Sequence, residues 1–510
     1  MFKNLYKAVF IITFFSILTR ILGFFIRIFM SRELGAEMIG VYQISVSICS
    51  VFMTLVNSGI PLTISRLSSE YKAKNDDLMA NKVVTSGTIL SFSLAVLVCT
   101  LTIIFKPVIV SLSHSSLVAS VLIALLPAVI GTSLNVGFKG YLWGKQKHFE
   151  NCVVDFLEQI LKIALMFILV TKAKTLEIAV INCAIAVSLA CLISNLLSML
   201  FYFKQKGKIV SPKGAFKNVF KKSFPITMLR LVSSIGGMVI SVVVPYILIK
   251  VGYSKEQALS LFGITLGMTL PLLYLPNTLV GSLATALVPD LAKLKAENNS
   301  KEFIGKVKTS ISFSVFISLL FVPCFMSIGK EIGIFVYKNE LSGILLSYFS
   351  LMMLPMGISD ITSSILNSMG YEFKSFVNFM VGNIFLILSI IFLPKYLGIY
   401  ALGLGMTLSL TVSSILNVIN IKKQLKFEKI ILKDTLKLCL FLVPSTLINK
   451  FTYNIFIRIF SSFFSIALSS ILGVIFYTTL CLIFKVFTID GLLVNFKKIK
   501  IFNKKKKKNV

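Results

Sequence analysis

Four cations lie inside long apolar stretches of the chain: Arg20, Arg27, Lys162 and Arg230. A cation at the centre of a bilayer costs roughly 2.5–3.5 kcal/mol on insertion scales, so such side chains usually face a water-filled cavity or a partner. The planar guanidinium of arginine can donate two parallel hydrogen bonds to a phosphate group. Cations that line a cavity therefore favour an anionic cargo, above all one that carries phosphate.

The composition is that of a membrane protein. Of 510 residues, 56% are hydrophobic and 14% are charged, and the mean hydropathy is +0.90. Repeated apolar runs of about 20 residues, such as 83–105 and 176–203, match a hydrocarbon layer roughly 30 Å thick. The sequence therefore predicts an all-α polytopic membrane protein without a folded soluble domain between its spans.

Hydropathy over windows of about 19 residues predicts about fourteen membrane spans. The expected spans are 6–30, 38–60, 83–105, 115–138, 152–171, 176–203, 224–249, 259–288, 308–329, 341–366, 376–394, 398–420, 434–450 and 455–486. The first begins with lysines and an apolar run, like a signal peptide. It has no small-x-small cleavage site, so we expect an uncleaved first span.

The lysines and arginines predict the orientation. They concentrate in alternate connections and in the tail, and the connection 204–223 alone contains seven lysines. Cytoplasmic loops attract Lys and Arg, so we expect both termini in the cytoplasm, as an even number of spans requires. The net charge of +32 then reflects topology rather than nucleic-acid binding, and the polybasic tail is expected to meet anionic lipid head groups.

The sequence offers little for a metal, a cofactor or an enzyme. The eight cysteines show no C-x-x-C spacing and lie mostly in apolar spans, where they are expected to act as small hydrophobic residues. His114 and His148 are the only histidines. Proton transfer and sugar activation need acids or histidines on substantial loops. We therefore expect no metal, no cofactor and no enzymatic activity.

The two halves of the chain repeat each other weakly. Arg20 of the first span corresponds to Arg230 of the seventh, and Tyr141 after the fourth span corresponds to Tyr371 after the tenth. Internal repeats are usual in secondary transporters, with the substrate site near mid-membrane between them. The expected organisation is a six-helix lobe over 1–203, a basic cytoplasmic linker over 204–223, a second six-helix lobe over 224–420, two additional transmembrane helices within 434–486 and a basic cytoplasmic tail over 487–510.

Four segments carry a family resemblance: TRILGFFIRIFMSRELGAEMIGVYQ, NSGIPLTISRLSSEYKA, FKGYLWGKQKHFENCVVDFLEQILKI and LPNTLVGSLATALVPDLAKL. They resemble bacterial polysaccharide-export flippases, relatives of the MurJ lipid II flippases in the multidrug/oligosaccharidyl-lipid/polysaccharide exporter superfamily. The resemblance implies two six-helix lobes around a central cavity that opens alternately to each side. It also implies an undecaprenyl-diphosphate-linked sugar or peptidoglycan precursor as substrate, and a role in spore cortex or cell-wall synthesis.

The match to the MurJ pattern of cavity arginines is partial. Arg20 resembles a first-helix arginine that faces the cavity in those relatives, whereas Arg27 is one residue further along than the pattern requires. The second-helix arginine of that pattern has no counterpart here, because the second span offers Gln43 and Asn57 instead. Substrate contacts are accordingly expected from Arg20, Arg27, Arg230 and Lys162.

Acidic residues in the spans are candidates for gating or ion coupling. Asp155, Glu158 and Lys162 are spaced i, i+3, i+7, so they lie close to one helix face. Glu158 either pairs with Lys162 to reduce the cost of burial, or the carboxylates release a cavity cation when substrate or a coupling ion arrives. Asp360 in the tenth span is a lone acid that either reaches solvent at the helix end or couples an ion. The ion itself (a proton, sodium or the membrane potential alone) stays open.

Other functions compete with a lipid-linked precursor flippase. A teichoic or capsular precursor exporter would use the same chemistry. A drug or metabolite antiporter for organic cations would need acidic cavity residues, which the basic deep charges argue against. A scaffold for cell-wall enzymes would leave the buried cations unexplained. The expected partners are a lipid-linked oligosaccharide, membrane lipids and cell-wall synthesis proteins, and no nucleic acid.

Overall fold

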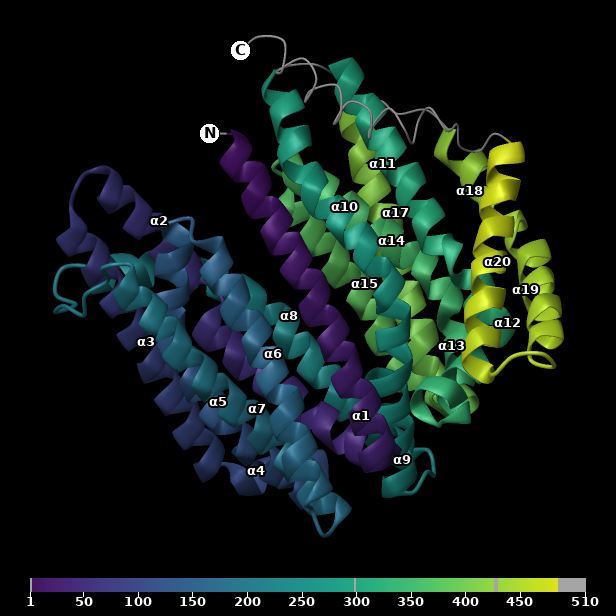
Figure 1. Cartoon of the computed structure of the whole chain (residues 1–510), viewed down its shortest axis with the longest axis horizontal. Helices are drawn as coiled ribbons and strands as arrows, with labels where there is room; N and C mark the ends of the chain where they lie inside the picture. The colour runs from purple at the N-terminus through teal and green to yellow at the C-terminus, as the bar shows by residue number, and fades with distance from the viewer. Residues whose placement is uncertain (1, 298–299, 426–429, 485–510) are drawn as a thin grey trace. The chain divides into compact units, whose positions relative to one another are not determined.

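The computed structural model describes residues 2–297, 300–425 and 430–484. Every regular element in these ranges is a helix (Figure 1). Packing divides the chain into two compact units, Met1–Gly267 and Met268–Val510. The predicted tail 487–510 lies outside the described residues. The expected all-α membrane architecture is confirmed.

The first unit contains nine α-helices and the start of a π-helical segment. They are α1 (Phe2–Asn57), α2 (Ile60–Ala73), α3 (Asp77–Ile104), α4 (Lys106–Ser113), α5 (Ser116–Gly144), α6 (His148–Thr171), α7 (Leu176–Lys204), α8 (Phe216–Lys250), α9 (Lys255–Phe262) and η1 (Gly263–Thr269).

The described part of the second unit is also helical. Its elements are α10 (Leu270–Ala296), α11 (Ser300–Leu320), α12 (Val322–Tyr337), α13 (Glu340–Phe349), η2 (Ser350–Met352), α14 (Met353–Ser368), α15 (Glu372–Phe392), α16 (Pro394–Leu397), α17 (Tyr400–Leu425), α18 (Ile430–Leu440), α19 (Leu442–Phe456) and α20 (Ser462–Ile483).

Eleven helical stretches among the described residues are long and apolar enough to cross a membrane. One of them, Ile11–Ala73, contains most of the first predicted span and the whole of the second. The fifth and thirteenth predicted spans fall on α6 and on α18 with α19, which are helical but lie outside those eleven stretches. All fourteen predicted spans therefore fall on helices, and the count agrees roughly with the prediction.

A corner at Gly35 divides α1 into two legs, residues 2–34 and 36–57. Gly35 has φ 74° and ψ 176°, a conformation that is open to glycine and strained for other residues. The second leg packs closely on α9, because a Cβ at Gly40 would collide with the carbonyl oxygen of Leu259. The corner and this close approach position the first two spans.

The core of the first unit joins five of its helices at one end. Ile64 of α2, Val84 of α3, Tyr141 of α5, Tyr202 of α7 and Val219 of α8 belong to one buried cluster. The rings of the two tyrosines lie 4.8 Å apart, edge to face. Burial of this apolar area drives the helices together. Helix α8 is thus held in the first unit from its first turns.

The packing boundary differs from the predicted linker. It lies between Gly267 and Met268, beyond the basic segment 204–223, so α8 and α9 fall in the first unit. The sequence placed the seventh span in a second lobe on the strength of the internal repeat. The division into two six-helix lobes stays a prediction.

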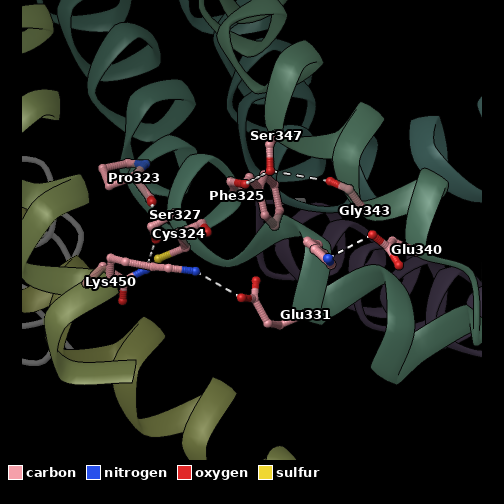
Figure 2. A network of polar contacts seen from close by, with 11 residues as sticks. Pro323, Cys324, Phe325, Ser327, Glu331, Glu340, Gly343, Ser347 and Lys450 are labelled. Carbon is pink, nitrogen blue, oxygen red and sulfur yellow. Dashed lines mark hydrogen bonds and ion pairs between the residues drawn. The ribbon is translucent and has the colours of Figure 1, made fainter. Parts of the chain in front are cut away.

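Polar contacts attach the last helices to the second unit. Lys450 Nζ of α19 lies 2.9 Å from Glu331 Oε1 of α12 (Figure 2). Asn449 Nδ2 of α19 donates to Ser327 Oγ of α12 at 2.6 Å. Asn449 is fully buried. Helices α12, α19 and α20 lie side by side in Figure 1 and are in contact. The two additional helices predicted within 434–486 therefore pack into this unit, with the thirteenth span broken at Phe441.

Candidate substrate-binding site

Arg20 and Arg27 lie on the first leg of α1. This leg packs on α6 through Phe15, whose ring centroid is 5.7 Å from that of Phe156, and through Phe29, 5.9 Å from Phe167. At 100° per residue, Arg20 and Arg27 are roughly 140° and 120° around the helix from Phe15. Both arginines therefore lie on one face of α1, which is turned away from α6.

Arg230 lies on α8, in the same compact unit as the two α1 arginines. Ser234 Oγ of α8 is 2.7 Å from Thr54 Oγ1 of α1, and Ser241 Oγ donates to Ser47 Oγ at 2.8 Å. These hydrogen bonds tie α8 along the second leg of α1. The sequence placed Arg230 opposite Arg20 in another lobe, whereas packing assigns all three arginines to one unit.

The three arginines share one electrostatic feature. Within the ranges that the structure describes, no carboxylate lies within 4.0 Å of the guanidinium of Arg20, Arg27 or Arg230. Arg20 and Arg230 are exposed on the protein surface and Arg27 is half-buried. A guanidinium at membrane depth without a carboxylate can accept an anionic ligand as its partner. Their role toward a substrate stays a prediction.

Lys162 differs from the arginines because it is paired. Its Nζ lies 2.6 Å from Glu158 Oε1, one turn earlier on α6, and the two side chains are 17% and 20% exposed. Ser194 Oγ of α7 donates to the other carboxylate oxygen, Glu158 Oε2, at 2.9 Å. The intrahelical pair that the spacing allowed is therefore present. A direct role for Lys162 in substrate binding stays a prediction.

Asp155 also has a cationic partner, one that the sequence did not suggest. Lys139 Nζ of α5 lies 2.6 Å from Asp155 Oδ1. Two lysines and two carboxylates thus form two ion pairs on α6 and its neighbour α5, and their charges cancel. Lys139 and Ser194 were missed because they come from helices other than α6, where residue spacing gives no information.

Amide side chains extend this polar region between α5, α6 and α7. Asn151 Nδ2 donates to the carbonyl oxygen of Lys139 at 3.4 Å. The side-chain oxygens of Asn135, Asn151 and Asn195 are buried and have no hydrogen-bond partner among the described groups. Buried acceptors of this kind give the interior of these three helices a polar character that is unusual within a membrane span.

Asp360 lies in the second unit, on α14. Asn277 Nδ2 of α10 donates to Asp360 Oδ2 at 2.7 Å. The acid lies eight residues before the last residue of α14, roughly 12 Å along the helix. That depth and the amide contact place Asp360 inside the helix bundle rather than at a solvated helix end. Its predicted part in gating or coupling stays a prediction.

The described residues contain no group of three His, Cys, Asp or Glu side chains that could hold a metal ion. The eight cysteines are free thiols, and six of them are buried. The geometry therefore directs attention to charge and hydrogen bonding along the spans.

Comparison with known proteins assigns this chain to a family. The polysaccharide biosynthesis protein family matches the chain over residues 5–295. The chain belongs to this family. The resemblance to polysaccharide-export flippases read from the sequence is thereby confirmed, and the protein is a multi-pass membrane protein.

Curated relatives within this family come from Bacillus subtilis strain 168. Stage V sporulation protein B is 26% identical over 291 residues, which cover 54% of this chain and 56% of that protein. The uncharacterized membrane protein YabM is 22% identical over 439 residues, 84% of this chain and 81% of that protein. The chain thus spans little more than half the length of stage V sporulation protein B in that match.

Solved structures with the same fold are transporters. The lipid II flippase MurJ in an inward closed conformation aligns with a TM-score of 0.69 and 19% identity, over 92% of this chain and 98% of that chain. An inward-facing multidrug resistance MATE family transporter of the MOP superfamily aligns with a TM-score of 0.68 and 17% identity, over 80% and 94%. At these identities the likeness establishes the fold.

Proposed function

We propose that this member of the polysaccharide biosynthesis protein family is a flippase for an undecaprenyl-diphosphate-linked sugar or peptidoglycan precursor. It would move a lipid II-like molecule across the cytoplasmic membrane by alternating access, with both of its own termini in the cytoplasm. The diphosphate needs cations and the sugars need a hydrated path, while the polyprenyl tail can stay in lipid. Cell-wall synthesis, including that of the spore cortex, is the process that such a substrate would supply.

One observation carries the proposal. Arg20, Arg27 and Arg230 have no carboxylate partner in the described ranges, whereas Lys139 and Lys162 are each matched by an acid. The neutralised pairs add no net charge to α5, α6 and α7. The arginines leave an excess of positive charge on α1 and α8, where two parallel hydrogen bonds to a phosphate would be strong. An exporter of organic cations would show the opposite sign.

The family and the solved structures support this choice of function. MurJ is named a lipid II flippase, and stage V sporulation protein B is named for sporulation. Catalysis is not part of the proposal, because the solved structures that share this fold are named as transporters and a flippase. Teichoic or capsular precursors carry the same diphosphate, so they are further substrates to test.

Leaflet exposure of a labelled substrate tests the proposal. Purified protein is reconstituted with fluorescent lipid II in the inner leaflet, and arrival at the outer leaflet is followed by quenching. We expect faster arrival than in protein-free vesicles, and no acceleration for a labelled phosphatidylcholine of similar size. Equal rates with and without protein would refute a flippase for lipid II. A panel of diphosphate-linked sugars then separates lipid II from teichoic and capsular precursors.

A further inference from the structure

The contact between Asn277 and Asp360 has one unmatched atom. Asn277 donates through Nδ2 to Asp360 Oδ2 at 2.7 Å, yet its own Oδ1 is buried without a hydrogen-bond partner in the described structure. Asn277 is 8% exposed. A buried acceptor left unsatisfied costs about 1–3 kcal/mol, so this atom needs a donor.

A protonated Asp360 supplies that donor. An ionised carboxylate only accepts hydrogen bonds, whereas a protonated carboxyl group has one O–H to give. The planar carboxyl and carboxamide groups can then form two parallel hydrogen bonds. The amide N–H donates to Oδ2, and the acid O–H donates to the amide oxygen. Both polar groups are satisfied only when Asp360 carries the proton.

The surroundings of Asp360 favour the neutral form. Helix α14 packs on α10, α11, α15 and α17. The charged residues on those helices are Asp290, Lys293, Lys295, Lys301, Glu302, Lys306, Lys308, Glu372, Lys374, Lys422 and Lys423. The side chains of Asp290 and Lys293 lie outside the described set, and none of the others forms an ion pair with Asp360 within 4.0 Å. An ionised carboxylate buried without a cation is strongly disfavoured.

We propose that Asp360 and Asn277 form a proton-binding site in the second unit, occupied by one proton in this conformation. The proton comes from water, binds a carboxyl oxygen of Asp360 and returns to water when the pair opens, so no other reactant is needed. A metal cation is a poorer occupant, because the pair supplies only three side-chain oxygens and one of them, Asp360 Oδ2, already accepts the amide N–H.

Infrared difference spectroscopy on the purified full-length protein tests the site directly. Aspartate labelled with ¹³C shifts the stretching band of any protonated aspartic acid. We expect such a band at neutral pH in the wild type and its loss in Asp360→Asn. Asp155→Asn is the matched control, because Asp155 has Lys139 as a partner at 2.6 Å and its removal should leave the band in place.

The Asp360→Asn variant is designed to fold. An amide at position 360 can exchange two hydrogen bonds with Asn277, as the protonated acid does, so the midpoint of thermal unfolding should not move. Asn277→Leu should keep the acid band and shift it to higher frequency, because the carboxyl loses its partner. A wild-type spectrum identical to that of Asp360→Asn would overturn the proposal. So would a sodium-dependent rise in unfolding temperature that Asp360→Asn abolishes.

The consequence for transport rests on the proposed function. If the protein moves a lipid-linked precursor, an imposed proton gradient should accelerate leaflet exchange in the wild type. In Asp360→Asn the rate should fall to the level seen without the gradient. The two proposals fail separately. If the wild type shows the acid band and Asp360→Asn loses it, but no lipid moves, the proton site is supported and the flippase is refuted. If lipid moves but the wild type shows no such band, the flippase is supported and the proton site is refuted.

Discussion

Substitutions in the Glu158–Lys162 pair can distinguish two roles for it: stabilising the inserted protein, or gating transport. Each side chain is no more than 20% exposed, and their charged atoms lie 2.6 Å apart. Removing one partner of a buried pair costs about 3–5 kcal/mol, because the other charge stays buried alone. Residual solvent contact puts the expected cost at about 3 kcal/mol, more than a hundredfold in the folding equilibrium. Glu158→Gln and Lys162→Met should therefore each lower the unfolding temperature and the membrane level.

The double variant Glu158→Gln with Lys162→Met separates the two roles. No lone charge remains, so stability should return close to that of the wild type. If the pair only reduces the cost of insertion, transport should return as well. We expect transport to stay lost, because two apolar residues would have served insertion at lower cost. The Lys330–Glu340 pair, with side chains 52% and 56% exposed, is the matched control and its removal should change neither property.

The readouts are complementation alongside a membrane-level blot, thermal unfolding in detergent, and leaflet exchange in proteoliposomes. A double variant with wild-type stability and wild-type transport would refute gating by Glu158 and leave α6 with a structural pair. A double variant as unstable as either single variant would refute the reasoning on charge burial itself.

Three further predictions follow from the other features. Arg20→Ala should abolish transport with the protein still inserted, because it removes a charge-assisted contact of roughly 1.5–3 kcal/mol, and Arg20→Lys should restore it only in part. Arg458→Ala, at a position between α19 and α20 and outside the proposed site, is the control. Full transport in Arg20→Ala would exclude the phosphate contact. In a cysteine-free background, single cysteines should react with an external reagent in 172–175 and not in 206–214; reaction of the latter in sealed cells would reverse the orientation. Gly40→Ala should cost about 3 kcal/mol, since its Cβ meets the Leu259 carbonyl of α9, and an unchanged unfolding temperature would exclude that contact.

Most of the fold could be predicted from the sequence because the lipid environment restricts the backbone to few conformations. A backbone in hydrocarbon must satisfy its own hydrogen bonds, so each long apolar run predicts a helix, and all fourteen predicted spans fall on helices. The corner at Gly35 could not be read in the same way, since a glycine between two apolar runs is compatible with a loop or a bend. The packing boundary beyond Gly267 depends on contacts such as Thr54 with Ser234, which are 180 residues apart.

The site was predictable to the extent that helical spacing determines it. Glu158 and Lys162 are four residues apart, so their pairing could be expected from the sequence. The partnerships of Lys139 with Asp155 and of Asn277 with Asp360 join different helices, and spacing says nothing about which helices meet. Residue type identified the charged groups at depth, while only packing shows which of them already have partners.

Whether a charged side chain within the membrane spans already has a partner decides how that charge should be interpreted. Five cations of the first unit are candidates to meet an anion: Arg20, Arg27, Arg230, Lys139 and Lys162. Of these five, Lys139 and Lys162 are each paired with a carboxylate at 2.6 Å, and in the described ranges the three arginines have no carboxylate within 4.0 Å. The lysine pairs can influence a substrate only by changing partners, so they belong with conformational change. The arginines have no carboxylate partner in the described ranges, so the proposed recognition of an anion rests on α1 and α8.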